Sequence, residues 1–281
     1  MTHIFQHEAM ATCFEIVIAE QERDYARHAA AAAFRELDRL ETILSRFVES
    51  SDISRANGLA RGATTTITDE TLECLVIAAD VSLATNRAFD PAYASIRPPD
   101  LAADTPPFTL DPDTHTITSL ATKLRLDLGA VGKGFALDRM ADVLRDWKVE
   151  SACLNAGGSS VLPIGNAASG ERGWPVGLGE GRGQRTIRLT GASLSGSGTA
   201  VKGEHLIDPR TGRPALRTTR AWALAPTATE ADALSTAFFI MAESDIAALC
   251  AAHPQIGAAL TARDGTLNLY GALQETSNSS Y

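Results

Sequence analysis

Apolar and polar positions follow a helical period in two long stretches of the first third of the chain. Residues 24–47 carry apolar side chains three and four apart with charged residues on the opposite side, and a second helix is expected from Asp69 to about Arg87. We expect Asp69 to cap the second helix and the Phe-Asp-Pro sequence at 89–91 to end it. The polar residues 45–58 close on Asn-Gly, which predicts a turn region between the two helices.

Strand-like runs dominate the rest of the chain. They lie at 13–18, 64–68, 108–120 (two strands across a turn), 124–128, 149–164 (interrupted by two glycines), 174–178, 186–190, 192–196, 205–212 and 258–270 (a hairpin with an Asp-Gly turn). Helices are expected from about 135 to 147, from 227 onward, and in a second short piece ending near 252.

Strands in runs beside amphipathic helices predict an α+β protein, with mixed or antiparallel sheets and packed helices. The length of 281 residues allows a single domain over residues 1–281 or two closely associated lobes. The proline-rich residues 97–107 predict a surface loop, and the polar residues 274–281 a frayed tail.

Composition narrows the classes of function. The formal net charge of −9, with no basic block, argues against a nucleic-acid or anionic-membrane surface. Four cysteines lie far apart without C-x-x-C spacing, which favours buried reduced thiols over a zinc or redox site. The amino terminus lacks the basic start and apolar core of a signal peptide, and no 18 uncharged apolar residues occur in a row. We therefore expect a soluble, cytoplasmic protein.

A carboxylate near the start of the helix at 227 is the first candidate for chemistry. Thr227 and Glu230 have the spacing of a capping box, and the helix that follows is apolar nearly all round. Asp232 and Thr236 are four apart and so share one face. Asp232 could simply complement the helix dipole while Thr236 bonds back to a carbonyl. Alternatively, the two oxygens are half of a Mg²⁺ site completed by substrate phosphates.

The best place for phosphates is the sequence G-A-V-G-K-G at 129–134. Its glycines let the backbone approach a ligand, the loop opens a helix whose first N–H groups favour an anion, and Lys133 lies among them. The pattern is neither a Walker A loop nor G-x-G-x-x-G, and a plain glycine turn is the alternative. A second glycine turn at Asn155–Gly158 would read a ligand or form a β-bulge, and a third lies at Ser195–Gly198.

His205 and Asp208 lie three apart before a proline. They could act as a proton acceptor and the group that orients it, or as ordinary polar side chains at a strand end.

Taken in order, these segments resemble the ApbE-like family of FAD:protein FMN transferases over nearly the whole chain. The matching segments are M-A-T at 10–12, S-R-F-V-E-S-S-D-I-S-R-A-N at 45–57, F-D-P at 89–91, D-L-G-A-V-G-K-G-F-A-L-D at 127–138, N-A-G-G at 155–158, S-G at 197–198, H-L-I-D-P-R-T-G-R-P at 205–214 and A-D-A-L-S-T-A at 231–237. The resemblance implies a T-fold-related architecture.

The resemblance also implies a reaction and a set of site residues. FMN would pass from FAD to a Ser or Thr hydroxyl of an acceptor flavoprotein through a phosphoester bond, with release of AMP. Mg²⁺ would be held by Asp232, Thr236 and the backbone carbonyl of Gly132. Lys133, His205 and Asp208 would be catalytic, with His205 the first candidate for the general base. The implied FAD contacts are Phe47, Asp90, Asp127, Gly129, Lys133, Asp138, Asn155, Gly157, Gly158, Ser197, Gly198 and His205.

The sequence departs from the family pattern in places. Ala11 replaces a glycine, Ser159 replaces an aspartate, the stretch from Gly198 to His205 is short, and Ala-Tyr-Ala-Ser follows F-D-P where the family has Thr-Val-Gly. These changes concern acceptor recognition more than FAD or Mg²⁺ binding. Two other functions therefore stay open: an FAD pyrophosphatase that gives FMN and AMP, and a non-catalytic FAD-binding protein.

Overall fold

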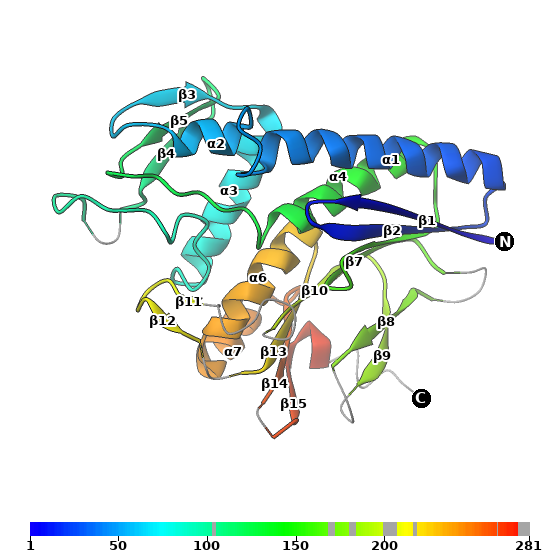
Figure 1. Ribbon diagram of the computed structural model, residues 1–281. Helices are drawn as coiled ribbons and strands as arrows, with labels where there is room; N and C mark the ends of the chain where they lie inside the picture. Colours follow the sequence, from blue (N-terminus) through cyan, green and yellow to red (C-terminus); the bar gives the residue numbers. More distant parts are fainter. Residues whose placement is uncertain are drawn as a thin grey trace.

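A computed structural model describes residues 1–102, 105–167, 172–179, 184–198, 207–215, 218–262 and 264–274. Its centre is an eight-stranded sheet in which every neighbouring pair is antiparallel (Figure 1). In spatial order the strands are β1 (Thr2–Ala9), β2 (Thr12–Ala19), β6 (Ala152–Ala156), β7 (Ser160–Ile164), β10 (Ser193–Gly198), β13 (Arg220–Ala225), β14 (Gly257–Thr261) and β15 (Leu267–Gly271).

Helices pack against one face of this sheet. They are α1 (Arg23–Leu44), α4 (Gly132–Asp146) and α6 (Ala228–Ile240), with α3 (Asp69–Ala84) against α6 and α7 (Glu243–Ala252) against β14 and β15. The hairpin of β8 (Trp174–Leu178) and β9 (Arg185–Leu189) packs against the other face through Leu194, Trp222 and Leu224. None of the helices in the described ranges combines the length and apolar character needed to cross a membrane.

A smaller group of elements lies at the end of α1. It contains α2 (Asp52–Asn57) and a three-stranded sheet in the order β3 (Thr64–Thr66), β5 (Thr116–Ser119), β4 (Phe108–Asp111). The short strands β11 (Ile207–Asp208) and β12 (Arg213–Pro214) form a separate hairpin. The predicted α+β class, with helices packed on antiparallel sheets, is confirmed, whereas the division into lobes stays a prediction.

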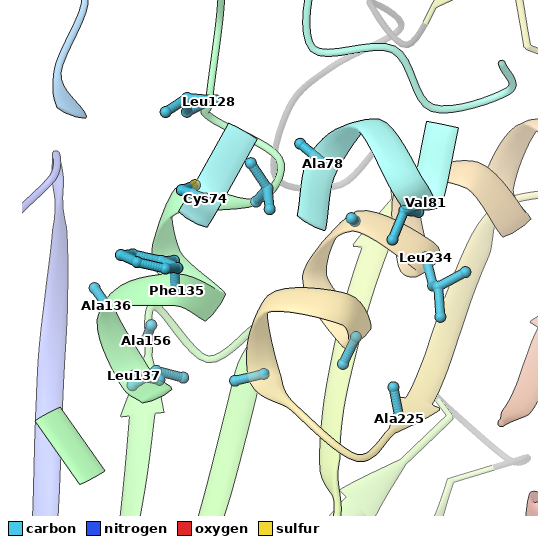
Figure 2. Close-up of a cluster of buried hydrophobic side chains, with 14 of the residues drawn as sticks. Cys74, Ala78, Val81, Leu128, Phe135, Ala136, Leu137, Ala156, Ala225 and Leu234 are labelled. Carbon is cyan, nitrogen blue, oxygen red and sulfur yellow. The ribbon is translucent and has the colours of Figure 1, made fainter. Parts of the chain in front are cut away.

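One hydrophobic cluster connects the helical layer to the eight-stranded sheet and to the three-stranded sheet. Figure 2 shows its middle, where α3 contributes Cys74 and Val81, α4 contributes Phe135, and α6 contributes Leu234 above the strands. Alanines line the sheet-facing and helix-facing sides, among them Ala225 of β13, and small side chains let the backbones approach closely. This dense layer fixes the relative positions of α4 and α6.

The predicted strand at 124–128 was wrong. The segment is extended, but only Lys123 at its edge forms an isolated bridge, with Ile96. The side-chain amide of Asn57 takes the place of a neighbouring strand, since its Oδ1 accepts from the N–H of Leu126 at 2.6 Å and its Nδ2 donates to the same residue's carbonyl at 3.0 Å. Local alternation predicted the extended conformation correctly but not its partner.

Other boundaries also differ from the sequence predictions. The region 45–58 contains the short helix α2, and α1 ends at Leu44 instead of 47. The helix expected at 135 begins at Gly132, so that the glycine loop supplies its first turn. The two glycines expected within one strand form the turn of the β6–β7 hairpin, and residues 195–198 lie within β10 instead of a turn. The amino-terminal strand β1 was not expected.

The amino termini of α4 and α6 cap each other. Asp138 of α4 accepts from the N–H groups of Ala228 and Thr229 at 2.9 and 2.8 Å, while Asp232 of α6 accepts from the N–H of Gly134 at 3.1 Å. Both carboxylates therefore lie where helix dipoles favour negative charge. Burial raises the pKa of the Asp138 carboxyl, although its hydrogen bonds with Thr229 and Ala228 act in the opposite direction.

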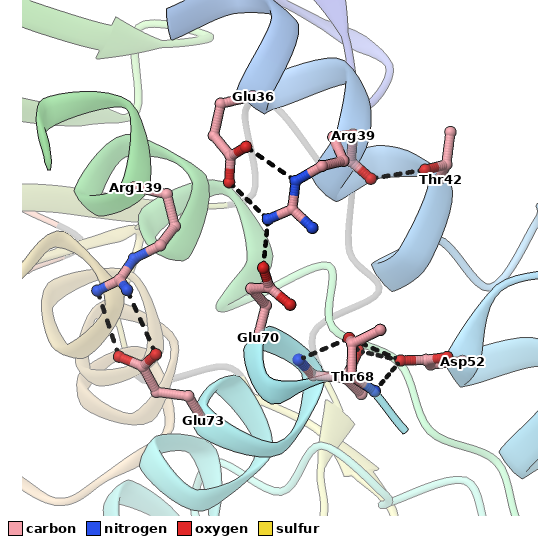
Figure 3. A network of polar contacts seen from close by, with 9 residues as sticks. Glu36, Arg39, Thr42, Asp52, Thr68, Glu70, Glu73 and Arg139 are labelled. Carbon is pink, nitrogen blue, oxygen red and sulfur yellow. Dashed lines mark hydrogen bonds and ion pairs between the residues drawn. The ribbon is translucent and has the colours of Figure 1, made fainter. Parts of the chain in front are cut away.

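Polar contacts join the smaller group to the helical layer (Figure 3). Arg39 of α1 bonds to Glu36 and to Glu70 at the start of α3. Asp52 of α2 is buried and accepts from the N–H and hydroxyl of Thr68 at 2.7 and 2.8 Å and from the Thr71 hydroxyl at 2.7 Å. Thr68, and not the expected Asp69, is the N-cap of α3.

Gly134→Ala is expected to destabilise the fold. A Cβ at this position would lie 2.1 Å from the carbonyl oxygen of Ala228, a backbone atom that moves only if α6 moves. We expect a loss of about 3 kcal/mol or more in the free energy of unfolding, measured by urea denaturation. Gly58→Ala is the matched control, because its φ of −83° suits alanine and its Cβ would meet only ordinary contacts, and it should change stability by about 1 kcal/mol at most.

Asp52→Asn is expected to destabilise the fold at neutral pH but not in acid. Burial acts to raise the pKa of this carboxyl, but hydrogen bonds from Thr68 and Thr71 outweigh it and hold the pKa below its usual value. The ionised group therefore stabilises the fold above about pH 4, and this contribution is lost as the pH falls through the lower folded pKa. Unfolding at pH 7 should show a loss of about 1–3 kcal/mol that shrinks towards pH 2. A difference in the free energy of unfolding that persists unchanged at pH 2 would contradict a stabilising role for the ionised Asp52 carboxylate.

Candidate active site

A cavity of about 520 Å³ opens where the glycine loop, β10 and the start of α6 meet. Its volume is within the range of small-molecule sites. Walls also come from the β1–β2 turn, the end of α1, the β6–β7 turn and β13. The site residues expected from the sequence that line it are Phe47, Asp127, Gly129, Gly132, Lys133, Gly157, Ser197, Gly198 and Asp232.

Asp232 is the most enclosed carboxylate of this cavity, with an exposed fraction of 3%. Besides the N–H of Gly134, its Oδ2 meets the Lys133 ammonium at 3.4 Å, and its Oδ1 accepts from the Ser195 hydroxyl at 3.3 Å. The Thr227 hydroxyl accepts from the N–H of Glu230 at 3.2 Å, which confirms the predicted helix start. The second bond of the predicted capping box differs: the Glu230 carboxylate accepts from the Thr227 hydroxyl and not from the Thr227 backbone N–H.

Strand β10 presents different residues to its two sides. Ser195 and Ser197 face α6, where the Ser197 hydroxyl lies 2.8 Å from that of Ser235 and 3.2 Å from that of Thr236. Gly196 and Gly198 face the other side, where a Cβ would come within 2.9 Å of the Trp222 ring and 2.8 Å of the Arg220 side chain. The S-G-S-G sequence therefore gives hydroxyls to one side and room for two large side chains on the other.

The glycine loop is held by charged groups at its base. Asp127 accepts from the N–H of Gly129 through Oδ1 at 2.9 Å, and its Oδ2 pairs with Arg46 Nε at 3.3 Å. The Lys133 ammonium donates to the carbonyl of Gly129 at 3.2 Å. Lys133 thus bridges the loop to Asp232. The N–H groups of Gly132 and Gly134 already donate to the Leu128 carbonyl and to Asp232, so the Lys133 ammonium is the group here that would attract an anion.

Phe47 lies at the edge of the cavity with 82% of its surface exposed. The guanidinium of Arg46 lies 4.3 Å from its ring centroid. An exposed ring fixed by a cation on one side offers an apolar surface on which a planar heterocycle can stack.

Two turns shape the opposite wall. Gly157 has a φ of 59°, and a Cβ there would lie 2.3 Å from the Thr12 hydroxyl oxygen. The Asn155 side chain accepts from the N–H of Gly158 at 2.9 Å and so orders this turn, but neither residue lines the cavity. In the β1–β2 turn, Ala11 has a φ of 57°, a conformation that glycine adopts more readily.

Other expected site residues lie elsewhere. Asp90 pairs with Arg87 at 2.7 Å and accepts from the N–H of Ala92, so that it organises its own turn. Asp138 caps α6, as described above. Asp208 contacts Arg210 through both carboxylate oxygens in the β11–β12 hairpin. His205 lies outside the described residues.

The oxygens around Asp232 fit a hard divalent cation. Thr236 lies one helical turn beyond Asp232, and its hydroxyl is buried behind Ser197, with a residue exposure of 8%. A carboxylate and hydroxyls are ligands of the kind Mg²⁺ takes when it also keeps waters and binds phosphates. Gly132 lines the same cavity. Within the described ranges, no cluster of three or more His, Cys, Asp or Glu residues forms an alternative metal site.

Sequence reasoning did not assign Arg46 or Arg220, which both line the cavity. Arg46 lies directly before Phe47 in the S-R-F segment, and a cation beside an aromatic residue there is a signal that could have been used. Arg220 opens the apolar run of β13, and its guanidinium lies 5.4 Å from the Trp222 ring. Burial lowers the pKa of the Arg220 guanidinium. A single charged residue at the start of a strand does not indicate from the sequence that it lines a cavity.

Curated relatives share parts of the chain. A protein named FAD:protein FMN transferase from Treponema pallidum (strain Nichols) is 31% identical over 165 residues, which cover 51% of this chain and 45% of the relative. One of the same name from Klebsiella pneumoniae (strain 342) is 31% identical over 118 residues, 37% of this chain and 35% of the relative. The chain thus matches less than half the length of these two relatives.

Solved structures share the whole fold. The ApbE protein of Thermotoga maritima has a TM-score of 0.82 at 24% identity, covering 98% of this chain and 99% of that one. The flavin transferase ApbE of Vibrio cholerae has a TM-score of 0.83 at 21% identity, covering 97% of both chains. The model of the ApbE family matches residues 10–260. The cavity, the glycine loop and the Asp232 helix all lie within this match, and the chain belongs to the ApbE family.

Proposed function

We propose that this chain is a Mg²⁺-dependent FAD:protein FMN transferase that moves FMN from FAD to a Ser or Thr hydroxyl of an acceptor protein. The observation that carries this is the position of Asp232, which brings a buried carboxylate, the Lys133 ammonium and the first turn of α4 together at one cavity. The names of the curated relatives support the same reaction.

The residues of the cavity suit one aromatic end and the pyrophosphate of a dinucleotide. Phe47 offers an exposed ring for a flavin or adenine, and the glycines at 129 and 132 leave the backbone open to a pyrophosphate. Lys133 would neutralise charge on the pyrophosphate as the bond to AMP breaks. Asp232, Thr236 and the Gly132 carbonyl would hold Mg²⁺, which would supply further neutralisation of phosphate charge.

Transfer requires the acceptor hydroxyl to attack the FMN phosphorus while the phosphoanhydride bond to AMP breaks. AMP leaves with the bridging oxygen, and the hydroxyl proton passes to a base. The protein's part is to align the hydroxyl in line with the leaving group and to stabilise charge. His205 remains the first candidate base. Asp208 is the weaker candidate, because it would have to leave Arg210 to accept a proton.

Asp232→Asn is expected to abolish transfer without unfolding the protein. The asparagine oxygen can still accept from the N–H of Gly134, so the cap on α4 is kept while the charge is removed. We expect AMP release and FMN transfer to fall about 100-fold or more. AMP is measured by chromatography, with Mg²⁺ and FAD, and the acceptor's gain of FMN by intact mass. Thr236→Val, which removes only the hydroxyl, should give a smaller loss.

Asp146→Asn is the matched control, since it removes an exposed carboxylate at the far end of α4. It should leave AMP release unchanged. AMP formed equally well without any acceptor would make the protein an FAD pyrophosphatase. FAD binding without AMP would make it a non-catalytic flavin binder, and either result would overturn the proposed transfer.

A further inference from the structure

A second cavity, of about 220 Å³, lies beside the first. It is lined by Arg46, Asn57, residues 93–94 and residues 123–127. Arg46 and Asp127 line both cavities, so that their ion pair stands between the two. Tyr93 and Ala94 belong to the segment where this chain departs from the family pattern. The second cavity is therefore lined in part by residues that the family pattern does not contain.

The floor of this cavity is a fixed extended segment. Lys123 pairs with Ile96, the N–H of Arg125 donates to the Ser95 hydroxyl at 3.0 Å, and the Asn57 amide holds Leu126 from the other side. Side chains of an extended segment alternate. Leu124 and Leu126 accordingly point into the core, whereas Lys123 and Arg125 are exposed on the cavity side.

The exposed side of this segment is cationic. The side chains of Lys123 and Arg125 form no ion pair or hydrogen bond with any residue in the described ranges. Arg46 adds a third cation but is paired with Asp127, which also lines the cavity, so Lys123 and Arg125 carry the uncompensated charge. The chain as a whole carries a formal charge of −9, so this group of cations is opposite in sign to the net charge and would attract an acidic partner. Complementary charge of this kind selects a partner and its register.

We propose that the second cavity binds an acidic segment of the acceptor polypeptide, beside the hydroxyl that receives FMN; this rests on the proposed function. Alternate residues of an extended strand are about 6.5 Å apart. Lys123 and Arg125 have this spacing, and so do carboxylates at alternate positions of an extended peptide. Tyr93, 49% exposed, adds an aromatic surface for the peptide backbone. Because the Arg46–Asp127 ion pair lines both cavities, a segment bound in the second cavity lies next to the first.

The Arg46–Asp127 ion pair also connects the two cavities through a chain of contacts. A carboxylate that competes for Arg46 weakens the hold on Asp127, which fixes the N–H of Gly129, whose carbonyl accepts from Lys133. Arg46, which the acidic segment would contact, is thus three contacts away from the Lys133 ammonium.

The test uses two short labelled peptides, each with one threonine between two residues that are aspartates in the first and asparagines in the second. Binding is measured by fluorescence anisotropy at low salt, with and without FAD. The intact protein should bind the aspartate peptide about tenfold more tightly. The double variant Lys123→Glu, Arg125→Glu should lose this preference while its Kd for FAD stays unchanged.

The control is Arg23→Glu, Arg27→Glu, which makes the same change in net charge at the other end of α1, roughly 30 Å from Arg46. It should keep the preference. The proposal is overturned if the intact protein does not distinguish the peptides, or if the control variant loses the preference equally. Lys123→Gln, Arg125→Gln replaces the first variant if charge reversal lowers the Tm. A preserved preference without FMN transfer would overturn the proposed function alone.

Discussion

The mutual capping of α4 and α6 is the contact on which the site depends. Each helix lends a carboxylate to the amino terminus of the other, Asp138 to the first N–H groups of α6 and Asp232 to that of Gly134. The helices can come this close only because residue 134 has no side chain. Asp232 consequently arrives beside Lys133 with its charge already stabilised by a helix dipole. The same contact therefore holds the helical layer together and builds the centre of the cavity.

The eight-stranded sheet supports the Asp232 site through strand β10, which presents different residues to the two faces of the sheet. On β10, Ser195 and Ser197 bring hydroxyls to Asp232 and Thr236, while the alternating glycines at 196 and 198 leave space for Trp222 and Arg220. The cavity thus reaches from the helical side past the sheet to Arg220. Polar chemistry and bulky packing are separated by the pleat alone, which a strand achieves without any irregularity in its backbone.

The sequence predicted what is local and missed what depends on distant partners. The start at Thr227 and the shared face of Asp232 and Thr236 follow from capping and helical period, which are properties of neighbouring residues. The extended segment at 124–128 was read as a strand because nothing nearby reveals that Asn57 replaces its partner. The glycines of β10 were read as a turn because the side chains that need their space come from β13. The motif at 127–138 likewise led to the cavity through Asp127, whereas the helix carries Asp138 away to α6.

Part of the cavity wall consists of backbone and of side chains no larger than alanine. Gly129, Gly132, Gly157 and Ala11 all line it, and two of these four adopt a left-handed φ. Where these residues line it, the form of the cavity is set by main-chain torsions, whereas Phe47, Lys133 and Arg220 shape other parts with their side chains. At Gly157 a Cβ would lie 2.3 Å from the Thr12 hydroxyl oxygen, so this part of the wall accepts a side chain only if the β1–β2 turn moves.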